Sequence, residues 1–308
     1  MPSSEDRIDA CAWLLLIVLS VLWGGSFFFN GVVLRELPPF TTVLLRVSLA
    51  AIILLPGVWL YRLEFPRGVA GWKPFFAVAL FNNVLPFSLI VSGQTYVASG
   101  LAAILNATTP LFTILVMAIA GEERLSARRV VGLIVGLFGV IILRGDALGF
   151  AGGQGLGILL CLAGAFSYGI AAMVARRHLG GTPPLASATF QLLASTVMMT
   201  VVAGAIERPW QLPMPGASTW FAVLGLAALS TALAYIVFFQ ILQRSGATNV
   251  MLVTLLIPVT AILLGTFVLG ESISLREIAG AVVIGSALLV IDGRVLKFCR
   301  LQMAKCPA

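Results

Sequence analysis

The sequence has little charge for its length. Only 10% of its 308 residues are Asp, Glu, Lys or Arg, and 60% are hydrophobic. A soluble domain carries roughly 25% charged residues. This shortage excludes an ordinary soluble protein, because a soluble core of this size cannot hide so much apolar surface. The chain is therefore predicted to be an integral membrane protein.

Residues for a metal or nucleic-acid site are also scarce. There is one histidine, His178, and the four cysteines show no CxxC or metal-ligand spacing. The net charge of +7 does not indicate nucleic acid, because the basic residues are scattered between apolar runs. We predict no cofactor, no metal ion and no nucleic-acid partner.

Acidic residues are missing from the middle of every apolar run. An intramembrane enzyme needs a nucleophile–base pair, paired aspartates or metal ligands at that depth. Proton-driven carriers often place a carboxylate or a histidine there. No catalytic residue is therefore predicted, and coupling through a midplane carboxylate is not expected.

What the sequence does contain is ten apolar runs, each close to the ~20 residues that cross a bilayer. Prolines and glycines separate several of them, as at Pro38-Pro39 and from Gly180 to Pro184. The predicted fold is an all-α protein that crosses the inner or plasma membrane ten times. The predicted spans are 12–34, 39–60, 74–93, 98–120, 127–144, 155–176, 184–206, 218–241, 247–269 and 275–293.

The distribution of Lys and Arg predicts the orientation. With the N-terminus in the cytoplasm, the inside segments hold 14 of the 19 basic residues and the outside segments hold 4. Cytoplasmic loops of membrane proteins carry such an excess of positive charge. Both termini are therefore predicted to be cytoplasmic.

The two halves of the chain repeat one another. A shift of 145 positions places Pro38-Pro39 on Pro183-Pro184, and a shift of 148 places Pro110 on Pro258. Each half then holds five spans, an odd number, so the second half enters the membrane from the opposite side. Inverted repeats of this kind are typical of secondary transporters, with the site at the repeat interface. The predicted parts are a first five-helix repeat at 1–146, a second at 147–295 and a basic cytoplasmic tail at 296–308.

Short motifs occur in the same order in both halves, over nearly the whole chain. The motifs are Trp23-Gly24, Pro38-Pro39 with Arg46 downstream, Glu122-Glu123-Arg124-Leu125-Ser126 with Gly132, and Gly270-Glu271-Ser272 with Gly280. In these motifs the chain resembles an EamA-type member of the drug/metabolite transporter superfamily, and within it the YddG-like amino-acid exporters. That resemblance implies ten helices in two inverted five-helix repeats, and export of amino acids and other small metabolites.

Polar and aromatic side chains inside the spans are the candidates for a substrate pathway, because polar groups in a membrane need partners or a water-filled cavity. Trp23, Phe27 and Asn30 share one helical face at i, i+4 and i+7. Packing between helices is the alternative role for all of these residues. The predicted substrate-binding residues are Trp23, Phe27, Asn30, Asn82, Asn83, Asn106, Thr109, Tyr168, Tyr235 and Phe238.

Prolines inside the spans are predicted to act as hinges or gates, namely Pro86, Pro110 and Pro258. Pro86 disturbs the carbonyl four residues earlier, that of Asn82. Asn82 and Asn83 point about 100° apart on a helix, so at most one faces a given cavity squarely.

Arg46 lies roughly 10 Å into the second span. One interpretation is that it snorkels toward the outer interface. The other is that it contacts a substrate carboxylate or a gate.

Small residues form stripes on the fifth and tenth spans, at Gly132, Gly136, Gly280 and Gly285. Such stripes let helices pack closely. They predict scaffold contacts or the face of a homodimer.

The function predicted from these features is export of small metabolites, most of all amino acids including aromatic and hydrophobic ones, by alternating access through a central cavity. Aromatic rings hold an apolar side chain or an ammonium group, and amides hold a carboxylate. Phosphorylated substrates would need more than one Lys or Arg. The alternatives are an exporter of cationic drugs or other metabolites, a channel, and a non-transporting membrane protein.

Overall fold

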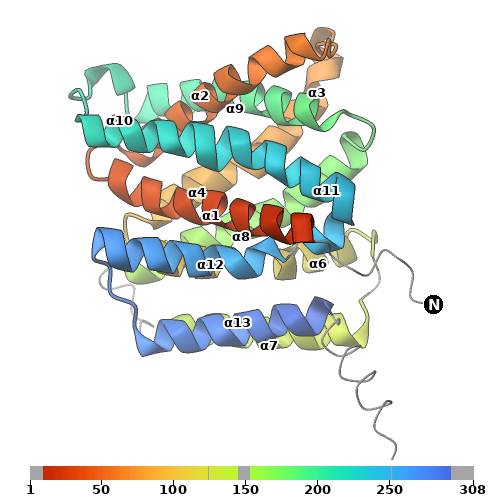
Figure 1. Cartoon of the computed structure of the whole chain (residues 1–308), viewed down its shortest axis with the longest axis vertical. Coiled ribbons are helices and arrows are strands. Elements are labelled where there is room, and N and C mark those ends of the chain that lie inside the picture. The colour runs from red at the N-terminus through yellow and green to blue at the C-terminus, as the bar shows by residue number, and fades with distance from the viewer. Residues whose placement is uncertain (1–9, 124, 145–152, 251, 293–308) are drawn as a thin grey trace, which may run out of the picture.

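The computed structural model describes residues 10–123, 125–144, 153–250 and 252–292 (Figure 1). Within these ranges every regular element is helical and there is no strand, so the all-α prediction is confirmed. The predicted boundary between 146 and 147 and the predicted tail at 296–308 lie outside the described residues.

Helices in the first half follow the apolar runs, with two interruptions. A π-helical turn divides the third run, and a short break divides the fourth. The elements are α1 (Ala10–Val33), α2 (Pro39–Leu60), α3 (Gly68–Ala79), η2 (Leu80–Val84), α4 (Leu85–Gly93), α5 (Ser99–Asn106), α6 (Thr109–Ile119) and α7 (Ala127–Arg144).

The second half has a similar order of elements. Its π-helix η4 starts at Gly225, which is 145 positions after the start of η2 at Leu80. This spacing equals the sequence shift between the halves. The elements are α8 (Gln154–His178), α9 (Pro184–Ile206), the 3₁₀-helix η3 (Pro209–Gln211), α10 (Ala217–Leu224), η4 (Gly225–Leu233), α11 (Ala234–Val250), α12 (Val253–Leu264), η5 (Gly265–Leu269) and α13 (Leu275–Asp292).

Three predicted boundaries are wrong by about one helical turn or more, namely the start of the third span, the end of the eighth and the start of the ninth. The third span begins at Gly68 and not at 74. The ninth begins at Val253 and not at 247, because α11 continues through the predicted loop to Val250. That loop contains no proline, and a single glycine at Gly246 does not end a helix there.

Seven segments of the described chain are long and apolar enough to cross a membrane, and Val253–Leu269 is a shorter apolar helix. The helices α7 and α13 each carry three charged residues among 18, which lowers their apolar character. Large hydrophobic side chains such as Ile17, Phe138, Val201 and Phe221 are exposed on the surface, as expected where lipid is the solvent. The seven segments are Cys11–Val33, Pro39–Leu60, Gly68–Gly93, Ser99–Ile119, Gln154–His178, Pro184–Ile206 and Ala217–Arg244.

The two halves pack through reciprocal contacts. α2 packs against α9, and α7 packs against α13, so helices at corresponding positions meet. The first helix of each half packs on helices of the other half at equivalent places. α1 packs on α12 and on η4 with α11, and its counterpart α8 packs on α6 and on α4 with η2. This pattern is the one that a two-fold relation between the halves produces.

The helices α7 and α13 form a separate layer in Figure 1. Of the predicted stripe glycines, Gly132 and Gly280 lie in the contact between these two helices. Gly136 instead faces Leu111 of α6, and a Cβ on Gly285 would meet no heavy atom within 4 Å. A Cβ on Gly139 would lie 3.2 Å from the Gly280 carbonyl oxygen, and a Cβ on Gly280 would lie 3.1 Å from that of Gly139. The two backbones can approach this closely only because both residues lack a side chain. These glycines therefore serve a contact within one chain, while a homodimer through these helices stays a prediction.

Three glutamates tie the halves together at the end of the bundle where α1 and α9 finish, called the outer end below because the sequence predicts that it faces outward. Each carboxylate accepts hydrogen bonds from backbone amides at the start of a helix in the other half. Such amides lack intrahelical partners and favour negative charge. The contacts are Glu207 with Thr41 (2.6 Å), Glu36 with Gly216 (2.7 Å) and Glu271 with Ser99 (3.0 Å).

Candidate functional site

A group of polar side chains meets between the two halves and is called the central polar cluster below. Its members come from α2, η2, α9, η4 and α11. Side-chain hydrogen bonds join α2 and η2 of the first half to α9, η4 and α11 of the second half. The cluster therefore lies at the repeat interface, and it consists of Arg46, Asn82, Asn83, Gln191, Ser195, Thr231 and Tyr235.

Arg46 is buried, with only 6% of its surface exposed. Its Nε donates a hydrogen bond to Thr231 Oγ1 at 2.9 Å. Its guanidinium carbon lies 3.8 Å from the centre of the Phe87 ring, a cation–π contact. The side chain therefore does not snorkel to the outer interface. Among the residues that the structure describes, no carboxylate forms an ion pair with it.

Both asparagines of the third span join the cluster, although at most one was predicted to face it. Asn82 Nδ2 donates to Gln191 Oε1 at 2.8 Å and to the Tyr235 hydroxyl oxygen at 3.0 Å. Asn83 Nδ2 donates to Ser195 Oγ at 2.9 Å, and Asn83 Oδ1 accepts from the Tyr235 hydroxyl at 3.1 Å. Two features allow this. The π-helix η2 replaces the regular α-helical geometry, and the partners on α9 lie one turn apart.

We expect Asn82→Ala to reduce the transport proposed below about tenfold without reducing the amount of folded protein. The variant loses two interhelical hydrogen bonds, each worth about 1 kcal/mol or less in a membrane protein, too little to unfold the chain. Transport by reconstituted protein and the monodisperse fraction in size-exclusion chromatography measure the two effects. Ser88→Ala is the control, since Ser88 lies on the same span and its hydroxyl donates to the Met199 sulfur at 3.7 Å. Wild-type transport by Asn82→Ala would assign Asn82 to packing.

Pro86 disturbs a different carbonyl from the one predicted. In η2 the backbone bonds run from residue i to i−5, as from the Leu85 N–H to the Leu80 oxygen. Pro86 has no N–H, so the carbonyl without a backbone donor is that of Phe81 rather than Asn82. The Ser167 hydroxyl donates to this Phe81 oxygen at 2.9 Å, which fixes α8 against the π-helix.

Aromatic side chains lie around the cluster. The hydroxyls of Tyr168 and Tyr235 lie within electrostatic reach of Arg46, and Tyr235 stacks on Phe239 with ring centres 6.2 Å apart. The ring of Trp23 contacts that of Phe238, with ring centres 5.6 Å apart. The structure thus places Tyr168 and Tyr235 at the cluster, and Trp23 with Phe238 beside it.

The structure separates Phe27 and Asn30 from the cluster. Phe27 is 5% exposed and packs in a hydrophobic core with Leu101 and Ile104, so it is a core residue. Asn30 is 2% exposed and donates through Nδ2 to Gln94 Oε1 at 2.8 Å, close to the outer end. The i, i+4, i+7 spacing of Trp23, Phe27 and Asn30 therefore does not bring all three side chains to the cluster.

Asn106, Thr109 and Pro110 mark the break between α5 and α6. The Thr109 hydroxyl donates to the Asn106 carbonyl at 2.7 Å, and Pro110 lies in the first turn of α6. The hydroxyl thus satisfies a carbonyl that the interruption leaves free. The second half differs, since Pro258 lies inside a continuous α12. Pro110 and Pro258 thus lie in different local backbone structure, and their role as hinges stays a prediction.

Sequence reasoning missed Gln191, Ser195 and Phe87 as members or neighbours of the cluster. Gln191 lies 145 positions after Arg46, at the corresponding place in the second half. Gln191 and Ser195 are polar residues at i and i+4 in an apolar span, a spacing that places both on one face. This pattern was the signal that could have found them.

Comparison with known proteins gives a family and a common fold. The model of the EamA-like transporter family matches residues 11–145 and again residues 155–291. One solved structure, described as the crystal structure of a protein, superposes with a TM-score of 0.63 and 20% identity, covering 92% of this chain and 97% of its own.

Curated relatives are similar over most of their length. The "Uncharacterized transporter YoaV" of Bacillus subtilis is 23% identical over 87% of this chain and 92% of its own. The "Uncharacterized inner membrane transporter YedA" of Escherichia coli is 27% identical over 91% and 90%. The "Probable amino-acid metabolite efflux pump" of Escherichia coli is 26% identical over 90% and 93%. With the apolar helices described above, these matches identify a multi-pass protein of the inner membrane.

Proposed function

This chain belongs to the EamA-like transporter family, and we propose that it is a secondary transporter that exports zwitterionic amino acids by alternating access at the central polar cluster. The substrates include large hydrophobic and aromatic amino acids. The transporter has ten membrane-spanning helices in two inverted repeats, with both termini in the cytoplasm.

Three observations support the inverted repeat. The family model matches each half separately. The helices of the halves pack through reciprocal contacts, and both halves contain a π-helix at corresponding positions. With five spans in each half, the second half is inverted relative to the first, and the excess of Lys and Arg on one side favours a cytoplasmic location for both termini.

The observation that carries the proposed substrate is the buried Arg46 without a carboxylate partner in the described chain. A charge inside a membrane protein is costly unless it is paired. A substrate carboxylate would supply that partner and would form a charge-assisted hydrogen bond. The same guanidinium repels a cationic drug. Arg46 therefore favours a substrate with a carboxylate over the main alternative, export of cationic drugs.

The neighbours of Arg46 suit the rest of an amino acid. The Asn82 and Asn83 amides and the Tyr235 hydroxyl offer donors and acceptors. Phe87 and Tyr168 offer aromatic faces for an apolar side chain or an ammonium group. A single arginine fits one carboxylate better than a phosphate ester, which favours several basic groups.

The hydrogen bonds of the cluster also suggest how the two halves are coupled. In this conformation the side chains of η2 bond directly to α9 and α11 across the repeat interface. A substrate that exchanges these bonds for its own would loosen one half from the other. Alternating access requires that the substrate interact differently with the two conformations of the transporter. This exchange of hydrogen bonds would supply that difference.

Efflux from proteoliposomes tests the proposal. Purified protein is reconstituted into liposomes that contain labelled leucine, phenylalanine, a phosphate ester or a cationic drug, one at a time. We expect faster efflux of an amino acid than from protein-free liposomes. Movement of the phosphate ester or the drug without movement of any amino acid would refute the proposal.

A further inference from the structure

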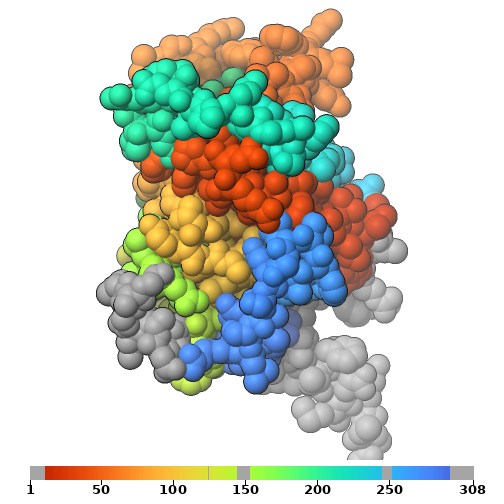
Figure 2. All heavy atoms as spheres, turned by 90° about the vertical axis from the view of Figure 1, so that its left-hand side faces the viewer, coloured from red at the N-terminus to blue at the C-terminus, as the bar shows by residue number. Residues whose placement is uncertain are grey.

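We propose a second binding site for a zwitterionic amino acid in a cleft at the outer end, separate from the central polar cluster. The cleft has a volume of about 360 Å³ and is lined by Arg35, Gln94, Thr95, Ser99 and Glu271. Figure 2 views this end, where the end of α1 (red), the α4–α5 connection (yellow-orange) and the connection from η5 to α13 (blue) lie side by side. The volume is within the usual range of ligand pockets, about 300–1,000 Å³.

Two opposite charges line the cleft without pairing. Arg35 and Glu271 form no ion pair with each other or with another residue of the described chain. A free amino acid carries an ammonium and a carboxylate on one carbon atom. The ammonium would bind Glu271 and the carboxylate would bind Arg35, so both charges gain a partner. The choice of an amino acid over another zwitterion rests on the proposed function.

The carboxylate of Glu271 is held in place before any ligand arrives. It accepts hydrogen bonds from the Ser99 N–H (3.0 Å) and the Ser99 hydroxyl (2.9 Å), and the Glu271 N–H donates to the Gly265 carbonyl at 3.0 Å. A Cβ on Gly265 would collide with the Glu271 carboxylate, so glycine at this position makes room for it. A carboxylate has about four acceptor positions, which leaves capacity for an ammonium group.

A buried acceptor lies beside the cleft. Asn30 is 2% exposed and its Oδ1 has no hydrogen-bond partner among the described residues. Its Nδ2 donates to Gln94 Oε1, and Gln94 lines the cleft. A buried polar atom without a partner is costly. Asn30 itself does not line the cleft, whereas Leu34 and Leu269 do and offer apolar surface for a side chain.

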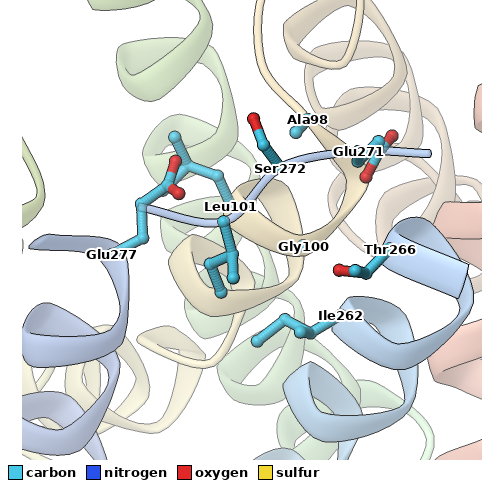
Figure 3. Close-up of a pocket in the computed structure, with 9 residues that line it drawn as sticks. Ala98, Gly100, Leu101, Ile262, Thr266, Glu271, Ser272 and Glu277 are labelled. Atoms are coloured by element: carbon cyan, nitrogen blue, oxygen red, sulfur yellow. The ribbon is translucent and has the colours of Figure 1, made fainter. Parts of the chain in front are cut away.

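The other side of Glu271 holds no such space. Figure 3 shows Glu271 and Glu277 on opposite sides of Leu101, where the connection after η5 crosses the start of α5. The hollow there has a volume of about 10 Å³, which is at most the space of one water molecule. The ligand must therefore lie on the Arg35 side.

Equilibrium binding of labelled leucine to the purified full chain tests the second site. We expect two leucines per wild-type chain at saturation, and one in Arg35→Ala. Arg208→Ala is the matched control, because Arg208 is an exposed arginine at the same end outside the cleft, and it should bind two. Glu271→Gln, which removes the charge proposed to bind the ammonium, should also bind one. The same number of bound leucines in Arg35→Ala and in the wild type would overturn the proposal.

Leucine analogues then report the chemistry of the site. In Arg46→Ala, which removes the central guanidinium, we expect one leucine to bind. Leucine methyl ester, without the carboxylate, and N-acetylleucine, without the ammonium, should compete for that site at least about tenfold more weakly than leucine. Equal competition by either analogue would refute recognition of a zwitterion.

The two proposals fail in different ways. Amino-acid transport by a wild-type protein that binds only one leucine would leave the proposed function standing and remove the second site. A leucine site that disappears in Arg35→Ala, in a protein that transports no amino acid, would support the second site and refute the proposed function.

Discussion

Arg46→Ala is expected to lower the initial rate of amino-acid efflux from proteoliposomes about 10- to 100-fold. A hydrogen bond to a charged group contributes about 1.5–3 kcal/mol, and each 1.4 kcal/mol is about a factor of ten. Arg46→Lys should lie between the variant and the wild type. It keeps the charge next to Phe87 but loses the planar guanidinium that matches a carboxylate.

The amount of folded Arg46→Ala protein should equal that of the wild type. No described carboxylate pairs with Arg46, so its removal leaves no buried charge of opposite sign behind. Arg208→Ala provides the control, since it removes an exposed arginine that is not a member of the cluster. Efflux at the wild-type rate by a well-folded Arg46→Ala protein would mean that Arg46 has a structural role and binds no substrate.

Gly139→Val is expected to destabilise the protein by about 1–3 kcal/mol, the usual cost of overfilling a close contact. The new Cβ would lie 3.1 Å from the backbone nitrogen of Ile284 and 3.2 Å from the Gly280 oxygen. Backbone atoms cannot rotate away as a flexible side chain can, so α7 and α13 must separate. The midpoint of thermal unfolding of the purified protein measures the loss.

Gly285→Val is the matched control for this prediction. It makes the same substitution inside α13, but a Cβ at Gly285 meets no heavy atom within 4 Å. The change in helix propensity is the same in both variants, so the difference between their unfolding midpoints isolates the contact. Equal midpoints in the two variants would contradict the close packing of α7 on α13.

The starts of several helices could be predicted from the sequence because their signals are local. α2 begins at Pro39 and α9 at Pro184, as predicted, since proline suits the first turn of a helix. The start of α12 could not be predicted in this way. The residues before it form no local break, and their helical conformation extends α11 to Val250.

The residues of the candidate site were likewise only partly predictable from local sequence patterns. The sequence placed Arg46, Asn82, Asn83, Tyr168 and Tyr235 inside apolar spans, where a polar group or a charge requires an explanation. It did not indicate that Phe27 packs in the core or that Asn30 lies at the outer end, although both share a helical face with Trp23. Spacing along a helix predicts in which direction a side chain points from the helix axis. It does not predict which neighbouring helix or residue the side chain meets at its position along the helix.

By itself, then, the sequence determined that this protein is helical, enters the membrane many times and repeats its pattern in two halves, because hydrophobicity and repetition are properties of the chain read in order. Only the tertiary structure decided what the polar residues contact. Thr231 lies 185 positions from Arg46, and the register of η2 brings two adjacent amides to one cluster. Such partners are set by how distant helices pack, and no local pattern in the sequence encodes that packing.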